Sequence, residues 1–195
     1  MAKCRRLVLC LAATGFAITA PAMAAPGELV VADFDSGAKP NNLGGDFGCW
    51  IKDPKDPMQG CAESFDRANR YGSRGNALRL IYSVASSQPA FGGLWLRLQD
   101  LDARKFNAIA LRVKGDTKLG FTTTFKVELK DAVDQTSHVY VRSVTDQWQD
   151  ISLPLKGFEG MANPARLKEL VITIEDSTAT AKQGVLYLDD IRFTR

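Results

Sequence analysis

Short segments in which apolar and polar residues alternate recur along the chain from residue 29 onward. Phe125, Val127 and Leu129, for example, alternate with Lys126 and Glu128. Alternation with a period of two predicts a β-strand that is buried on one side. The pattern predicts strands over nine ranges: Leu29–Phe34, Ala77–Val84, Leu94–Gln99, Ala108–Lys114, Thr124–Lys130, His138–Val144, Trp148–Pro154, Glu169–Glu175 and Val185–Phe193.

The segments between these strands are rich in Gly, Asp, Asn and Ser, and no long helical pattern separates one strand from the next. Many short strands without crossover helices indicate an all-β chain folded as an antiparallel β-sandwich. Two short helices are expected, over Asp102–Phe106 and Asn163–Glu169. In the second, Asn163 can cap the helix and Pro164 suits its first turn.

The first residues follow a different pattern. A basic start at residues 3–6 precedes an apolar run from Leu7 to Thr19, and the small residues around Ala24 then offer a cleavage point. This order predicts a secretory signal peptide over residues 1–24, with residues 25–195 as one mature domain. The alternative, an N-terminal membrane anchor, is disfavoured because the run is short for a spanning helix. We therefore expect a periplasmic or secreted protein with no membrane span after cleavage.

Removal of the signal peptide changes the charge balance. Three of the 25 Lys and Arg residues lie within it, which leaves 22 against 22 Asp and Glu residues. A mature chain with no net charge and no basic run is not expected to bind nucleic acid or a membrane surface.

Two of the four cysteines, Cys49 and Cys61, lie in the expected mature chain. An isolated pair in an exported protein predicts a disulfide, here closing the loop between them. Two free thiols and a metal-binding pair remain alternatives, and the metal pair is disfavoured because His138 is the only histidine. We expect Trp50 to cover the disulfide and Trp148 to pack in the core.

Carboxylates stand at apolar positions in the first and last strands. Asp189 shares the parity of the apolar residues in Val185–Phe193, and Asp33 has the same relation to its strand. An isolated buried charge is costly, so these groups need partners. With the adjacent Asp35 and Asp190 they form an oxygen-only donor set suited to Ca²⁺. The alternative is that these carboxylates cap loop N–H groups or pair with an arginine.

A larger set of segments carries a resemblance to a known family. These segments are DFD, NNLGG with Trp50, GNALRLIYSV, LDARKFNAIALRVKGD, FKVELKD, VTDQWQDISLPLKGF and LYLDDIRF. Together they resemble a galactose-binding-like jelly roll and are similar to family 11 carbohydrate-binding modules over most of the mature chain. The resemblance implies a structural calcium between the terminal strands, at Asp33 or Asp35 and at Asp189 or Asp190. It also implies β-glucan binding across the concave face of one sheet.

Outward positions of the predicted strands supply the candidate ligand-binding side chains. Sugar rings have apolar faces that stack on aromatic side chains, and their hydroxyls form hydrogen bonds with charged or amide groups. The candidates are Trp95, Arg97, Arg112, Glu128, His138, Tyr140 and Arg142. The alternative is a charged strand face that is simply solvated.

No catalytic motif is present: the sequence has no Gly-x-Ser-x-Gly, phosphate loop or dinucleotide fingerprint. We therefore expect no enzyme, but an exported carbohydrate-binding module that recognises a β-glucan-like or envelope polysaccharide or an oligosaccharide. A periplasmic protein-interaction or assembly module with an envelope protein partner is the alternative. It is based on LRVKGD and SLPLKGF, which also resemble the complex I intermediate-associated protein family. An unrecognised hydrolase ranks third.

Overall fold

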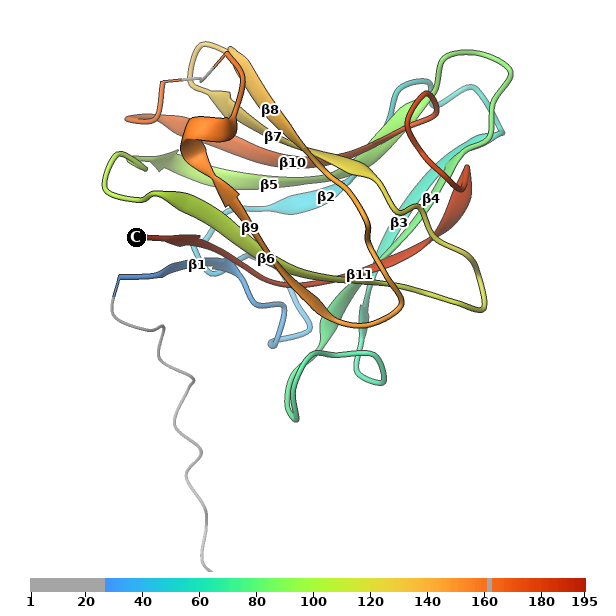
Figure 1. Ribbon diagram of the computed structural model, residues 1–195, viewed down its shortest axis with the longest axis horizontal. Coiled ribbons are helices and arrows are strands. Elements are labelled where there is room, and N and C mark those ends of the chain that lie inside the picture. Colours follow the sequence, from blue (N-terminus) through green and yellow to red (C-terminus); the bar gives the residue numbers. More distant parts are fainter. Residues whose placement is uncertain (1–26, 161–162) are drawn as a thin grey trace, which may run out of the picture.

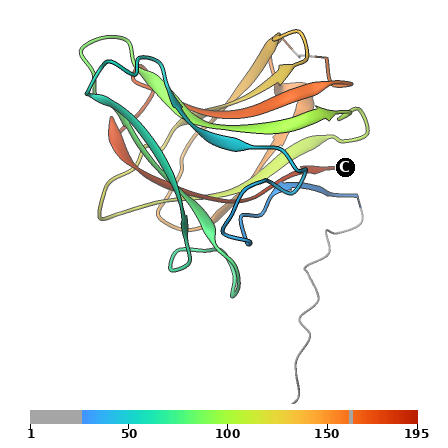
Figure 2. The same cartoon turned by 180° about the vertical axis from the view of Figure 1, so that it is seen from behind.

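The computed structural model describes residues 27–160 and 163–195, and these fold into two stacked antiparallel sheets (Figures 1 and 2). The six-stranded sheet has the order β3 (Gln59–Asp66), β4 (Ala77–Val84), β11 (Gln183–Thr194), β6 (Ala108–Gly115) and β9 (Gln149–Pro154), with β1 (Leu29–Ala32) against β11. The five-stranded sheet has the order β2 (Phe47–Ile51), β5 (Phe91–Leu101), β10 (Leu167–Glu175), β7 (Phe125–Asp131) and β8 (Thr136–Val141). A single 3-10 turn, Leu155–Gly157, is the only helical element in the described ranges. The expected β-sandwich is confirmed.

The core fills the space between the two sheets, where the alternating apolar residues meet. In β7 the residues Phe125, Val127 and Leu129 are fully buried, while the lysines and the glutamate between them face outward. Removing these apolar side chains from water is the main favourable contribution to such a fold. The alternation in the sequence therefore assigned the inward side of this strand correctly.

Four elements differ from the prediction. The strands β2 and β3 were not expected, because their sequences FGCWI and QGCAESFD mix small, polar and apolar residues without regular alternation. Neither expected helix forms: Asp102–Phe106 is a turn, and residues 163–166 are a turn that leads into β10. Asn163 does cap, since its side-chain oxygen accepts a hydrogen bond from Ala165 N at 3.0 Å, but strand pairing takes over directly afterwards.

The last strand contains a bulge that the pattern did not reveal. The register of β11 against β6 shifts between Asp189 and Arg192, and Asp190 has a left-handed backbone with a φ of 45°. Leu188 points into the core before this bulge, and Ile191 does so after it. An extra residue reverses the parity of everything that follows it. Asp189 is thus on the outer side of the six-stranded sheet and not on the core side, as parity had suggested.

The predicted disulfide is confirmed. Cys49 in β2 and Cys61 in β3 are bonded, with 5.5 Å between their Cα atoms. Since β2 belongs to the five-stranded sheet and β3 to the six-stranded sheet, the bond links neighbouring edges of the two layers. No helix within the described ranges has the length and apolar character needed to span a bilayer. The expected signal peptide lies outside the described residues.

Candidate functional site

The outer face of the five-stranded sheet presents its side chains in regular rows, because the strands pair in register. One row crosses all five strands at Gly48, Trp95, Val171, Glu128 and His138. The next rows on either side place Trp50 beside Gly93, and Glu169 between Arg97 and Lys130. Residues far apart in the sequence are thereby brought together on one surface.

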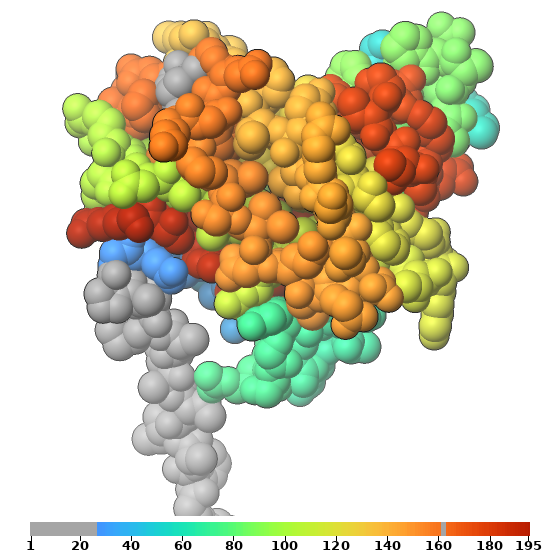
Figure 3. All heavy atoms as spheres, viewed as in Figure 1, coloured from blue at the N-terminus to red at the C-terminus, as the bar shows by residue number. Residues whose placement is uncertain are grey.

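A groove of about 400 Å³ runs over the middle of this face. In profile, the molecule is hollowed between the β7–β8 end of the sheet and the loops at the opposite strand ends (Figure 3). The groove is lined by Trp50, Trp95, Arg97, Glu128, Lys130, Thr136, Glu169 and Val171. Its walls thus combine two indole rings with charged and hydroxyl groups.

The two tryptophans are held by specific neighbours. The indole of Trp95 lies over Gly48, so closely that a Cβ atom at Gly48 would be 3.2 Å from Trp95 Cζ2. The Arg97 guanidinium lies 5.3 Å from the centre of the Trp95 ring. Trp50 packs edge-to-face on Phe91, with 5.7 Å between the ring centres. Both rings are only partly buried, which leaves apolar surface for a ligand.

The charged groups of the groove neutralise one another. Glu169, whose side chain is 11% exposed, pairs with Arg97 at 2.6 Å and with Lys130 at 3.0 Å. Lys126 pairs with Glu128 at 3.1 Å, and also with Glu175 at 2.6 Å. Three carboxylates therefore balance three cations, so the groove has no net charge to select a charged polymer.

Tyr140 and His138 lie farther along the same face. The Tyr140 hydroxyl donates a hydrogen bond to Glu175 Oε2 at 2.8 Å, and this bond raises the pKa of the tyrosine. His138 packs edge-to-face on Tyr140, with 5.7 Å between ring centres. Arg142 follows β8 and lies with its guanidinium 5.4 Å from the Tyr140 ring centre. Of the seven predicted ligand residues, six are therefore on or beside this face, and three line the groove.

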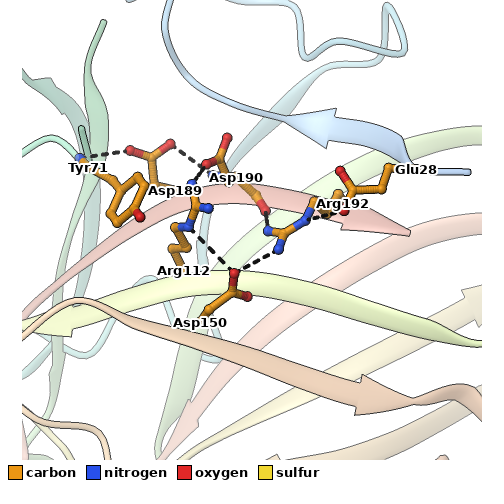
Figure 4. Close-up of polar contacts among 7 residues, drawn as sticks. All are labelled: Glu28, Tyr71, Arg112, Asp150, Asp189, Asp190 and Arg192. Atoms are coloured by element: carbon orange, nitrogen blue, oxygen red, sulfur yellow. Dashed lines mark hydrogen bonds and ion pairs between the residues drawn. The ribbon is translucent and has the colours of Figure 1, made fainter. Parts of the chain in front are cut away.

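The seventh, Arg112, does not belong to this face. It lies on β6 in the six-stranded sheet, so its grouping with the other candidates was wrong. Figure 4 shows Arg112 between Asp190 and Asp150, with the Tyr71 ring beside it. The Arg112 guanidinium carbon is 3.7 Å from the centre of that ring. Alternation fixes whether a side chain points in or out, but it does not say from which sheet it points.

Three of the four predicted metal-binding carboxylates, Asp33, Asp35 and Asp189, lie close together at one corner outside the six-stranded sheet. Burial raises the pKa of Asp189 to about 7, and the charges of Asp35 and Asp33 contribute to this rise. Asp35 also has a raised pKa, caused mainly by burial and then by the charge of Asp33. Asp189 accepts a hydrogen bond from Tyr71 N at 3.1 Å (Figure 4). The charges of Arg112 on Asp189 and of Arg74 on Asp35 oppose this rise, but they do not cancel it.

Asp190 does not join this corner. Its side chain forms an ion pair with Arg112, which is the alternative that the sequence had left open (Figure 4). Asp33 is partly engaged as well, since Asn42 Nδ2 donates to its carboxylate at 2.8 Å. Within residues 27–160 and 163–195, no three His, Cys, Asp or Glu side chains are arranged as a metal site. The oxygen donors at Asp33, Asp35 and Asp189 suit a hard cation chemically, but binding one would require them to turn towards a common point.

Sequence reasoning missed part of the groove. Trp50 had been assigned to the disulfide, whereas it lines the groove on the opposite side of β2 from Cys49. Glu169 and Val171 alternate with core residues in β10, so their parity was a usable signal. Trp148 was expected in the core but is only partly buried. It packs edge-to-face on Tyr71, with 6.0 Å between the ring centres.

A groove lined by indole rings and hydrogen-bonding side chains, on one face of an antiparallel β-sandwich, is the architecture of a carbohydrate-binding module. A family model described as carbohydrate binding domain 30 matches residues 64–195. The chain belongs to this family. No curated protein matches it in sequence.

Solved structures agree on the fold. The family 11 carbohydrate-binding module of the cellulosomal cellulase Lic26A-Cel5E of Clostridium thermocellum is similar with a TM-score of 0.62 and 16% identity, over 88% of this chain and 96% of that chain. A Clostridium thermocellum family 11 module in complex with a β-1,3-1,4-mixed-linked tetrasaccharide has a TM-score of 0.62 and 15% identity, over 88% and 97% of the chains. A family 30 module has a TM-score of 0.56 and 17% identity, over 74% and 80%.

Proposed function

We propose that this protein is exported and binds a neutral β-glucan chain in the groove of the five-stranded sheet, without cleaving it. The observation that carries the proposal is the placement of Trp50 and Trp95 beside paired charged groups in one open groove. The apolar faces of glucose rings can stack on the indoles, while the ring hydroxyls can bond to the carboxylates, the guanidinium and the Thr136 hydroxyl.

The charge balance of the groove supports a neutral ligand. Each carboxylate lies within ion-pair distance of a lysine or an arginine, so no excess charge awaits an acidic polysaccharide. The similar family 11 module was solved in complex with a β-1,3-1,4-mixed-linked tetrasaccharide. We extend that ligand class, mixed-linked β-1,3-1,4-glucan, to this chain as the first to be tested.

The test is affinity electrophoresis of the purified protein through gels that contain soluble β-glucans, xylans, mannans or galactans. We expect retardation by mixed-linked β-glucan. Trp95→Ala should lower the affinity about 30-fold or more, as removal of an aromatic hot spot does. Trp148→Phe is the matched control, because Trp148 packs on Tyr71 outside the other sheet. If no polysaccharide retards the protein, the proposal is wrong and a protein partner becomes the better explanation.

Catalysis and export are tested separately. Incubation of the protein with mixed-linked β-glucan should release no reducing ends, and their accumulation would make it a hydrolase. When the full chain is expressed in a Gram-negative host, mass spectrometry of the periplasmic fraction should find a protein that begins at Ala25. An uncleaved chain in the membrane fraction would contradict export as a soluble protein.

We also propose that Asp33, Asp35 and Asp189 bind calcium. Burial and then mutual repulsion raise the pKa values of Asp35 and Asp189, and a divalent cation between the carboxylates would offset both effects. Excess CaCl₂ should raise the melting temperature relative to EDTA, and Asp189→Asn should weaken that rise strongly. Asp150→Asn is the control, since Asp150 pairs with Arg112 and Arg192 instead. Equal melting temperatures in CaCl₂ and EDTA would count against a calcium site.

A further inference from the structure

The strand that carries Trp50 is weakly held by its own sheet. β2 is an edge strand of five residues, and within the described ranges it pairs only with β5. Three of its five cross-strand pairs contain a glycine: Gly48 with Trp95, Trp50 with Gly93, and Ile51 with Gly92. Cross-strand side-chain contacts supply much of the stability of a sheet, and glycine offers none. The β2–β5 ladder by itself is therefore a weak support for one wall of the groove.

Other contacts hold β2 from the opposite side. The Cys49 side chain points away from the groove and is bonded to Cys61, the third residue of β3. Two residues further along β3, Glu63 Oε2 accepts a hydrogen bond from Cys49 N at 3.1 Å, on the unpaired edge of β2. Lys39 Nζ then lies 3.2 Å from Glu63 Oε1 and 3.6 Å from Asp46 Oδ1, just before β2 begins. The covalent bond is the strongest member of this set.

We infer that the Cys49–Cys61 disulfide is a positioning pair for the ligand groove: it fixes β2 against the other sheet so that Trp50 stays in the groove wall. The inference rests on the proposed function, because it takes this groove as the ligand site. Opening the bond leaves β3 paired along its full length with β4, and leaves β5 paired with β10. The two sheets should therefore stay folded while Trp50 becomes mobile.

The first experiment detects this mobility without any ligand. Trp95→Phe combined with Trp148→Phe leaves Trp50 as the only tryptophan, since the chain has three. Acrylamide quenching of its fluorescence should be at least about twofold stronger after reduction, because local opening exposes a partly buried ring. The matched control keeps Trp148 alone, through Trp50→Phe and Trp95→Phe, and its quenching should not respond to reduction.

The second experiment measures affinity for mixed-linked β-1,3-1,4-glucan with the full chain oxidised, reduced, and as the Cys49→Ser/Cys61→Ser variant. We expect the two forms without the bond to bind about tenfold more weakly, a part of what complete loss of a hot-spot aromatic costs. Near-ultraviolet circular dichroism checks that they remain folded at the assay temperature. Glu63→Gln keeps the disulfide but weakens the link to Cys49 N and removes the ion pair with Lys39, so it should give a smaller loss in the same direction.

Unchanged quenching of Trp50, or unchanged affinity in a folded reduced protein, would overturn the inference. Global unfolding on reduction would overturn it as well, since the bond would then serve the whole fold. If the oxidised protein does not bind the glucan, it is the proposed ligand that fails, while the quenching experiment still decides whether the disulfide fixes Trp50.

Discussion

Gly48 offers the sharpest test of how the groove is built. A Cβ atom at this position would lie 3.2 Å from Trp95 Cζ2, 3.4 Å from Cε2 and 3.5 Å from Nε1. Carbon atoms prefer a separation of about 3.5–4.0 Å, so Gly48→Ala should push the indole away by only a few tenths of an ångström. The methyl groups of valine reach about 1.5 Å further. Gly48→Val should therefore tilt the Trp95 ring out of its position over β2.

The substitution should separate binding from stability. Valine suits a strand better than glycine, so the free energy of unfolding should be unchanged or higher by about 0.5–1 kcal/mol. The loss of a stacking aromatic costs about 2 kcal/mol or more in binding, which corresponds to about a 30-fold weaker affinity. We expect Gly48→Val to approach this loss and Gly48→Ala to lose about threefold at most.

Isothermal titration calorimetry with a mixed-linked β-glucan oligosaccharide, next to urea unfolding of the same proteins, measures both quantities. A double-mutant cycle locates the cause: in a Trp95→Ala background, Gly48→Val should weaken binding by less than about twofold, because the ring that it displaces is already absent. Wild-type affinity in the single Gly48→Val variant would refute the idea that this glycine sets the position of Trp95.

Three further predictions concern stability and the opposite sheet. Burial raises the pKa of Tyr82 to about 12, so the folded protein keeps a proton that the unfolded chain loses above pH 10. The contribution of Tyr82 to the free energy of unfolding is therefore fully present below pH 10, and about 3 kcal/mol of it should be lost as the pH rises through 12. Tyr82→Phe should remove that part of the slope in urea unfolding at alkaline pH, and identical slopes would contradict the assignment. Asn41 is buried, donates a hydrogen bond to Arg97 O at 2.9 Å and accepts hydrogen bonds from two amides of its own turn. Asn41→Ala should therefore lower the free energy of unfolding by about 2–3 kcal/mol, and a loss below about 0.5 kcal/mol would be too small for three hydrogen bonds of a buried side chain. Arg112→Gln should leave glucan affinity within about twofold of wild type, because Arg112 lies on the other sheet, and a larger loss in a stable protein would return it to the ligand site.

The alternation of side chains was a reliable guide wherever a strand is regular. In β7 it separated Phe125 and Val127, which are in the core, from Lys126 and Glu128, which face the groove side. In β11 the same rule failed at Asp189, because the bulge next to it adds a residue and reverses the parity. Such a bulge depends on neighbouring strands and loops, and the sequence pattern carries no mark of it.

The candidate site was predicted only in part, for a related reason. Trp95 and Arg97 were identified from their outward parity, and they do line the groove. Arg112 has the same parity in its own strand but lies on the other sheet. Trp50 was assigned to the neighbouring cysteine, because adjacency in sequence hid the fact that successive residues of a strand point to opposite faces. Knowing which strands are neighbours would have corrected both assignments.

The sequence by itself determined the β-sandwich, the inward faces of the regular strands, the pairing of Cys49 with Cys61 and the resemblance to carbohydrate-binding modules. These follow from local periodicity, from the isolated cysteine pair and from family-like segments, all of which can be seen without coordinates. The tertiary structure alone decided which strands share a sheet and that Trp50 and Trp95 line the same groove. It also decided that Asp190 pairs with Arg112, while Asp189 lies near Asp33 and Asp35. The physical reason is that strand order, register and bulges are set by long-range packing between segments that are distant in the chain.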